Sequence, residues 1–161
     1  MKFGGTSVGN LDKIKNVADI VEKQSKNNKL IVVLSAMAGV TNRMQKYLDE
    51  IKSNEKIEND LVLTAGENVT IGLLSSILKK RKIKSIPLLG WQIPILTDKH
   101  HLKAKILNIN NSRIKKFLKK HDVLVLAGFQ GISEEGYITS LGRGVSDTTA
   151  VAIASAIKAD R

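Results

Sequence analysis

The chain has 161 residues, of which 42% are hydrophobic and 25% charged, a composition typical of a soluble globular domain with its own core. It contains no cysteine, which excludes disulfides, thiolate metal sites and a cysteine nucleophile. The net charge is +11, but the lysines are spread over several segments and aromatic residues make up only 4%. We therefore interpret the lysines as solvated helix faces, with a nucleic-acid-binding surface as the weaker alternative.

The longest strongly apolar run, residues 30–40, is too short to span a bilayer and no secretory signal is found. We therefore expect a cytoplasmic protein without membrane contact.

Short apolar strands alternate with amphipathic helices in the first half of the chain. In chain order, the predicted elements are a strand end at residues 1–3, a helix at 11–26, a buried strand at 30–34, a loop of small residues at 35–40, a helix beginning at Thr41, an exposed connection at 53–59 and a helix at 61–78. Gly66 and Glu67 interrupt the apolar face of the last of these helices.

The second half continues the same alternation with shorter strands. The predicted elements are strands at 84–89, 93–97, 104–109 and 122–127, a short basic helix at 113–119, a loop at 128–131, a hairpin at 134–136, a strand at 137–140 and a final helix at 151–159. We expect Trp91 in the core and the three histidines (His100, His101 and His121) at the surface.

Strands and helices in alternation predict an α/β fold with a mainly parallel sheet that is covered on both faces. Sheets of this kind bind ligands at the carboxyl ends of their strands. Three loops in that position, residues 2–7, 35–41 and 128–131, are rich in glycine or small polar residues. We expect these loops to converge on one site together with residues 141–150.

The segment at residues 141–150 has the pattern of an anion-binding loop. Two glycines flank Arg143, and Ser146 or Asp147 suits the N-cap of the helix that follows. The N–H groups of a helix N-terminus attract an anion, and the arginine side chain has the fork of donors that matches a carboxylate or a phosphate. From spacing alone, an ordinary strand-to-helix turn with a good cap is an equally weighted alternative.

Six segments, taken together and in order, resemble the aspartate kinase branch of the amino acid kinase family. They are residues 2–8, 34–42, 63–67, 90–92, 128–131 and 141–150. The resemblance implies a three-layer α/β/α sandwich and transfer of the γ-phosphate of ATP, bound with Mg²⁺, to the β-carboxylate of L-aspartate. The product would be 4-phospho-L-aspartate, on the route to lysine, threonine and methionine, and the full-length protein is expected to be a homo-oligomer. Residues 1–161 would be the N-terminal, amino-acid-binding part of a truncated kinase domain, without its nucleotide-binding half and regulatory domains.

The resemblance also implies roles for individual residues. Lys2 would contact the ATP phosphates and stabilise the charge in transfer, and Asp147 would orient the catalytic lysines. Glu67 would bind the α-ammonium of aspartate and Arg143 its α-carboxylate. The remaining phosphate-binding positions are Phe3, Gly4, Gly5, Thr6 and Ser7. The remaining substrate-lining positions are Ser35, Thr41, Phe129 and Ser146. No residue is assigned as a metal ligand.

The chemistry of the residues agrees with this assignment. A β-carboxylate with an ordinary pKa of about 3.9 is ionised at neutral pH, so its attack on a phosphate needs no general base. The glycine loops accordingly contain no histidine. Three structural alternatives remain open: Lys2 as a flexible terminal lysine, Glu67 in an ion pair with a lysine, and Asp147 as a simple N-cap. Val145 departs from the family, which usually has glycine at that position.

Two other functional classes remain open from the sequence. One is another amino acid kinase, acting on glutamate, acetylglutamate or a nucleotide. The other is a non-catalytic, basic module that binds nucleic acid through its phosphates.

Overall fold

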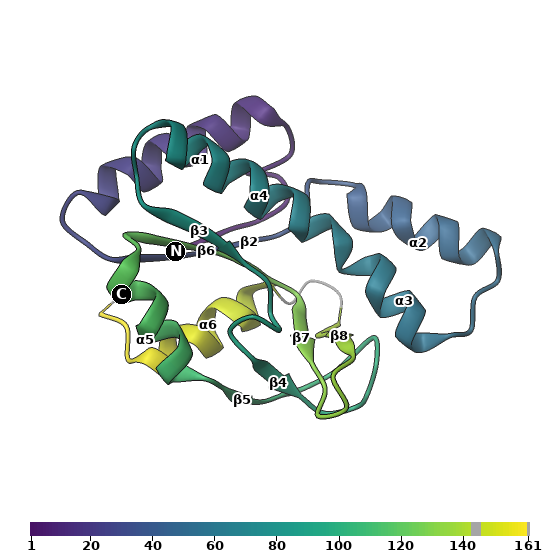
Figure 1. Cartoon of the computed structure of the whole chain (residues 1–161). Coiled ribbons are helices and arrows are strands. Elements are labelled where there is room, and N and C mark those ends of the chain that lie inside the picture. Colours follow the sequence, from purple (N-terminus) through teal and green to yellow (C-terminus); the bar gives the residue numbers. More distant parts are fainter. Residues whose placement is uncertain (143–145, 161) are drawn as a thin grey trace.

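A computed structural model of the chain describes residues 1–142 and 146–160, without the side chain of Ser146. The predictions made for Arg143, Val145 and the side chain of Ser146 lie outside these residues. The described residues form a three-layer α/β/α fold, with helices above and below a parallel sheet (Figure 1). The predicted fold class is therefore confirmed.

The central sheet has four strands, all parallel, in the order β1-β2-β6-β3. The bounds are Lys2–Phe3 for β1, Leu30–Leu34 for β2, Val123–Ala127 for β6 and Ser85–Leu88 for β3. All five residues of β6 are buried, because helices cover both faces of this sheet. Side chains alternate along a strand, so Val123, Val125 and Ala127 enter one core while Leu124 and Leu126 enter the other.

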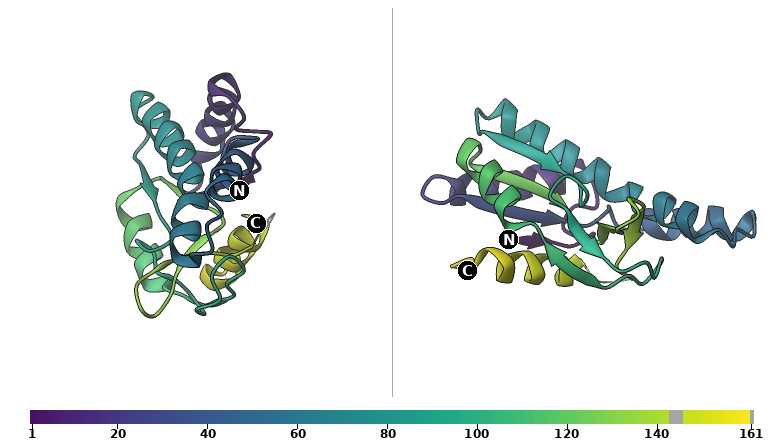
Figure 2. Two further views of the ribbon diagram at one scale, coloured as in Figure 1. Left: turned by 90° about the vertical axis from the view of Figure 1, so that its right-hand side faces the viewer. Right: turned by 60° about the horizontal axis from the view of Figure 1, so that its bottom comes forward.

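Four helices form the outer layers. Helices α1 (Leu11–Ser25) and α4 (Ala65–Lys80) cover one face, and α5 (Asn111–Lys120) and α6 (Ser146–Ile157) cover the other (Figure 1). Asn10 caps α1 by accepting a hydrogen bond from the backbone of Lys13. Two more helices, α2 (Val40–Glu50) and α3 (Lys56–Leu63), extend away from the layered body (Figures 1 and 2).

The remaining strands form a second, mixed sheet, whereas the sequence had predicted one mainly parallel sheet. Its order is β5-β4-β7-β8, with bounds Ile106–Ile109, Ile95–Thr97, Gln130–Ile132 and Ile138–Ser140. The predicted hairpin at residues 134–136 joins the antiparallel strands β7 and β8. Gly136 has a φ of 88° in this turn, a conformation that favours glycine.

Several predicted element boundaries are wrong, among them the start of the last helix, which was predicted at residue 151 but lies at Ser146. Residues 53–59 were expected to be an exposed connection, but α3 begins at Lys56 and Asn59 is buried. The predicted helix at 61–78 is divided at Thr64, whose hydroxyl donates to the carbonyl of Asp60 and ends α3. Residues 130–131, predicted as loop, belong to β7. Local polarity and glycine content had indicated the connection at 53–59 and the loop at 130–131, whereas the break at Thr64 is made by a local hydrogen bond within the predicted helix.

Residues Lys56–Lys80, counted through this break, are long and apolar enough to cross a membrane by length and composition alone. Half of the most apolar window is buried inside the fold. This is what the core helices of a soluble protein also show, so the length of the segment is weak evidence for a membrane span.

Candidate active site

The loops after β1, β2 and β6 lie side by side at the carboxyl edge of the parallel sheet. The backbone N–H of Ser35 donates to the carbonyl of Phe3 over 3.2 Å, and that of Gly128 donates to Leu34 over 2.9 Å. The N–H of Ala38 donates to the carbonyl of Gly5 over 3.1 Å. The three loops therefore converge as the sequence predicted.

Gly5 permits the close approach of the first two loops. A Cβ atom at this position would lie only 2.9 Å from the carbonyl oxygen of Ala36, a contact that real Cβ atoms do not make. The glycine is thus required by the neighbouring loop. This packing holds the backbone from Gly4 to Ser7 against the end of β2, with the N–H of Ser7 closing a turn onto the carbonyl of Gly4 at 2.9 Å.

Lys2 and Asp147 form an ion pair at this edge, with 2.9 Å between Nζ and Oδ1. The ammonium lies over the glycine loop, since a Cβ atom added to Gly4 would be 3.4 Å from it. The Asp147 side chain is 72% exposed, so the pair contributes little to stability. The ion pair instead fixes positions: it holds the Lys2 ammonium beside the loop after β1, and it holds the first turn of α6 next to that loop.

Glu67 lies in the first turn of α4, almost completely buried behind the β2 loop. Its Oε1 accepts a hydrogen bond from the N–H of Ala36 over 3.0 Å. Gly66 makes this approach possible, because a Cβ there would be 2.6 Å from that of Ala36. One turn further along α4, the hydroxyl of Thr70 donates to the carbonyl of Ser35 over 2.9 Å. Helix α4 and the β2 loop are therefore fixed to each other around the carboxyl group.

The second oxygen of this carboxyl group, Oε2, is buried and accepts no hydrogen bond within the described part of the chain. Burial raises the pKa of Glu67 to about 7, although the bond from Ala36 opposes this. No lysine pairs with Glu67 among the described residues, which argues against the structural alternative left open by the sequence. A buried, half-satisfied carboxylate is suited to receive a cationic donor such as an ammonium group.

Of the other predicted substrate-binding residues, the structure describes some and leaves others out. Ser35 follows β2 and Thr41 lies in the first turn of α2, both half-buried beside the converging loops. Arg143 and the side chain of Ser146 lie outside the described residues, so their contribution stays a prediction.

Phe129 is held in an unusual backbone conformation, with a φ of 69° that non-glycine residues rarely adopt. Two hydrogen bonds hold it: its N–H donates to the hydroxyl of Thr149 over 3.2 Å, and its carbonyl accepts from the N–H of Leu141 over 2.9 Å. The ring is buried against Leu48 and Leu63, in a small core under α2 and α3. The side chain thus packs in this core, while its backbone links the β6 loop to Leu141 at the end of β8.

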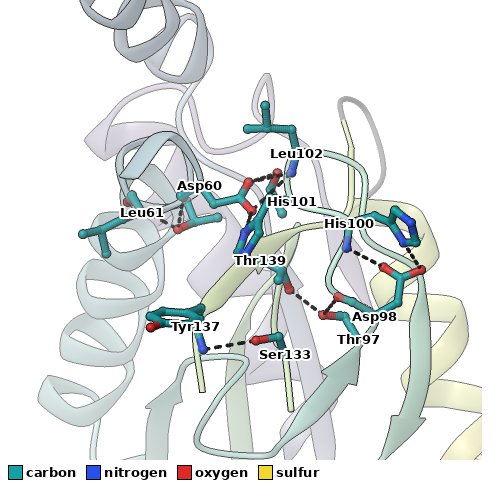
Figure 3. Close-up of polar contacts among 12 residues, drawn as sticks. Asp60, Leu61, Thr97, Asp98, His100, His101, Leu102, Ser133, Tyr137 and Thr139 are labelled. Carbon is teal, nitrogen blue, oxygen red and sulfur yellow. Dashed lines mark hydrogen bonds and ion pairs between the residues drawn. The ribbon is translucent and has the colours of Figure 1, made fainter. Parts of the chain in front are cut away.

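Two expectations about large side chains are wrong. Trp91 was expected in the core but is 47% exposed. All three histidines were expected at the surface, yet the side chain of His101 is only 10% exposed and contacts the fully buried Asp60 (Figure 3). A lone polar residue carries no periodic signal, so its partner could not be predicted from the sequence.

Gln130 is a site-forming residue that the sequence analysis did not single out. Its Nε2 donates to the carbonyl of Thr64 and to the side chain of Asn68, over 3.2 and 3.3 Å, and its Oε1 accepts from the N–H of Gly90 over 3.2 Å. It therefore joins β7 to the start of α4 and to the end of β3. The only feature of the sequence that could have indicated this role is a polar side chain between Gly128 and Gly131, directly after the apolar strand β6.

Comparison with known proteins identifies the family of this chain. The model of the amino acid kinase family matches residues 1–161, the whole chain. The chain belongs to the amino acid kinase family. Among curated members of the family, it is 47% identical to the aspartokinase of Rickettsia conorii over 165 residues and 48% identical to the aspartate kinase of Pseudomonas fluorescens over 163. Each match covers 99% of this chain and 41% or 40% of the relative, so the chain spans about two fifths of their length.

Solved members of the amino acid kinase family confirm the fold. The aspartate kinase of Synechocystis superposes with a TM-score of 0.82 at 38% identity, covering 99% of this chain and 26% of that one. Aspartokinase III of E. coli, solved in complex with aspartate and ADP, superposes with a TM-score of 0.83 at 24% identity, over 99% of this chain and 47% of that one. Among the described residues, no group of three or more histidines or acidic residues could hold a metal ion.

The raised pKa of Glu67 makes the stability of this kinase fold depend on pH. The folded state keeps the proton up to about pH 7, whereas the unfolded chain loses it near 4.5. The stabilising contribution is therefore complete below pH 4.5 and is lost as the pH rises through 7. We expect the difference in unfolding free energy between the wild type and Glu67→Gln to move by about 3 kcal/mol in favour of the variant between pH 4.5 and 8. Urea denaturation of both proteins measures this difference, and a constant difference over the range would contradict the burial argument.

Proposed function

We propose that these residues are the amino-acid-binding part of an aspartate kinase, which transfers the γ-phosphate of ATP to the β-carboxylate of L-aspartate. The observation that carries the proposal is the placement of two opposite charges around one pair of loops. Lys2 lies over Gly4 on one side, and the buried, half-satisfied carboxylate of Glu67 lies behind Ala36 on the other. The names of the relatives at 47% and 48% identity support the choice of substrate.

In this proposal the chain binds and orients two anions that repel each other. Glu67 receives the α-ammonium of aspartate at Oε2, and Arg143 binds the α-carboxylate through its fork of donors. Lys2, oriented by Asp147, neutralises charge on the phosphoryl group in transfer, beside the backbone of Phe3, Gly4, Gly5, Thr6 and Ser7. Ser35, Thr41 and Ser146, together with the backbone of Phe129, complete the wall around aspartate. The β-carboxylate attacks as the ionised group and needs no base from the protein.

Magnesium would enter with ATP and supply charge neutralisation at the phosphates. No residue of this chain is assigned as its ligand. The proposal further places the protein in the cytoplasm, as a homo-oligomer in its full-length form, and it needs no nucleic-acid or membrane partner.

The 161 residues on their own should bind aspartate weakly and produce no acyl phosphate from ATP. Transfer requires both substrates to be held in line, and the described site provides for the phosphates of ATP but not for its base or ribose. Calorimetry with aspartate and a hydroxamate assay with aspartate and ATP test the two halves of this expectation. A clear hydroxamate signal would place a complete nucleotide site within these residues.

Substrate choice is tested in a hybrid kinase, which joins this chain to the remaining residues of the Pseudomonas fluorescens aspartate kinase. We expect ATP-dependent hydroxamate from aspartate, and none from glutamate or N-acetylglutamate. The unmodified Pseudomonas enzyme is the control for the assay. Activity of the hybrid on glutamate or N-acetylglutamate alone would assign the chain to another branch of the family.

A further inference from the structure

Helix α4 holds a single peptide group of the β2 loop from both sides. The carbonyl of Ser35 and the N–H of Ala36 belong to this one peptide group. The hydroxyl of Thr70 donates to that carbonyl over 2.9 Å, and Oε1 of Glu67 accepts from that N–H over 3.0 Å. Glu67 and Thr70 are three residues apart in α4 and therefore lie on the same face of the helix. Two side chains of one helix thus fix the plane of the peptide.

Close packing leaves this peptide little room to move. A Cβ atom at Gly66 would lie 2.6 Å from the Cβ of Ala36, so the backbone of α4 lies directly against the loop. Thr70 is completely buried. On the other side, the N–H of Ser35 donates to the carbonyl of Phe3 over 3.2 Å. The peptide is therefore held between α4 and the end of β1 by packing and by hydrogen bonds together.

The position of this peptide determines how the carboxyl group of Glu67 is oriented. Oε1 is anchored at the N–H of Ala36, which leaves Oε2 as the oxygen without a hydrogen-bond partner among the described residues. A hydrogen bond weakens steeply as its angle closes, so a turned peptide would release Oε1. The carboxyl group could then rotate about its side-chain bonds. The direction of Oε2 therefore depends on the bond that Thr70 makes to Ser35.

The hydroxyl of Thr70 also has a local partner within its own helix. Its oxygen lies 3.0 Å from the carbonyl of Glu67, a bond that threonine commonly makes inside helices. A hydroxyl has one proton to donate, so the two carbonyls share it. The carbonyl of Glu67 has the regular helical N–H four residues further on as a second donor, whereas the bond to Ser35 joins two segments. Removal of the hydroxyl therefore acts mainly on the loop.

We propose that Thr70 is a positioning residue for amino-acid binding, which orients the carboxyl group of Glu67 toward the α-ammonium of the substrate by holding the peptide between Ser35 and Ala36. The inference rests on the proposed function, since Glu67 is the proposed ligand of that ammonium group. Thr70 is completely buried, so it acts through Glu67 and not by contact with aspartate. Loss of its hydroxyl should weaken aspartate binding and leave ATP binding unchanged.

The test compares Thr70→Val, which removes the hydroxyl and keeps the shape of the side chain, with Thr70→Ser, which keeps the hydroxyl. Thr97→Val is the matched control. Thr97 is equally buried, and its hydroxyl contacts that of Thr139 at 2.7 Å and the carbonyl of Asp98 at 2.9 Å, in the second sheet (Figure 3). Both valine variants lose one buried hydroxyl, but only the first acts on the β2 loop.

Two measurements on the 161-residue chain test the geometry. Amide hydrogen exchange at Ala36 should be about tenfold faster in Thr70→Val, the effect of one ordinary hydrogen bond, and unchanged in Thr70→Ser and Thr97→Val. In Thr70→Val the pKa of Glu67 should also rise above its wild-type value of about 7, because the bond from Ala36 favours the ionised carboxyl group. An NMR titration of the carboxyl carbon follows this pKa. A hydroxyl bonded only within its own helix would change neither quantity.

The hybrid kinase tests the effect on substrate binding. Thr70→Val should raise the KM for aspartate about tenfold and leave kcat and the KM for ATP near their wild-type values. Thr70→Ser and Thr97→Val should both keep the wild-type KM for aspartate. If the valine variant does not fold, Thr70→Ala takes its place, because alanine also lacks the hydroxyl and favours the helix.

Unchanged exchange at Ala36 in Thr70→Val would overturn the inference, as would faster exchange with an unchanged KM for aspartate. An equal rise of this KM in Thr97→Val would overturn it as well, since a general loss of stability would then explain both. An inactive wild-type hybrid would count against the proposed function instead, and exchange at Ala36 would still decide whether Thr70 holds the peptide.

Discussion

Lys2→Ala should lower the turnover of the hybrid kinase by about a thousandfold or more while aspartate binding persists. The reason is the position of the ammonium, which lies over Gly4 and is held by Asp147 at 2.9 Å. There it faces the loop proposed for the phosphates and not the Glu67 carboxylate proposed for the amino acid. A charge that acts on the phosphoryl group in transfer affects the rate far more than the binding of aspartate. Initial rates at saturating substrate, together with calorimetry for aspartate, measure the two quantities.

Lys29→Ala is the matched control. Lys29 also pairs with an aspartate at 2.9 Å, that of Asp122, and both its partner and itself are about half-exposed. This second pair lies at the opposite edge of the sheet, just before β2 and β6 begin. Its loss should leave turnover near the wild-type value. If Lys2→Ala kept near-normal turnover, or if both variants lost it equally, Lys2 would have no catalytic role.

Glu67→Gln should raise the KM for aspartate by about one to two orders of magnitude and leave the KM for ATP nearly unchanged. Glutamine keeps the acceptor for the N–H of Ala36, but at Oε2 it removes the charge and can present an amide N–H to an ammonium group. The same variant should be more stable than the wild type at pH 8, because the ionised form of a group with a pKa of about 7 is disfavoured by burial. Opposite effects on stability and on binding separate a ligand-binding carboxylate from a structural one.

Glu22→Gln is the control for this change of charge. Glu22 is a partly exposed carboxylate of α1 that contacts Arg81 at 2.8 Å, remote from the converging loops. We expect no change in either KM. If Glu67→Gln instead raised the KM for ATP, Glu67 would be reassigned to the nucleotide site. If the KM for both substrates stayed unchanged, Glu67 would be reassigned to a structural role.

The alternation of most strands and helices, and the edge of the parallel sheet at which the small-residue loops converge, were predicted from the sequence alone. The apolar run of β6 required burial on both faces, and the periodicity of α1 indicated one buried stripe. The glycine and small-residue loops after β1, β2 and β6 then had to share the carboxyl edge of a parallel sheet. The burial of β6 and the buried stripe of α1 could be predicted because each follows from the spacing of apolar side chains within one element.

The pairing of polar groups across the chain was decided only by the tertiary structure. Asp60 contacts Ser140 across a long stretch of sequence, and no local pattern predicted this pair. The contact between Lys2 and Asp147 was expected only from the family resemblance, because the pattern of residues around them does not indicate it. The break at Thr64 and the burial of His101 involve two further hydrogen bonds of Asp60. Apolar periodicity specifies which face of an element is buried, whereas a single hydrogen bond specifies one partner among many chemically equivalent ones. For this reason the sequence predicted the edge of the sheet at which the loops converge, and only the folded chain showed the hydrogen-bond partners of Asp60 and Glu67.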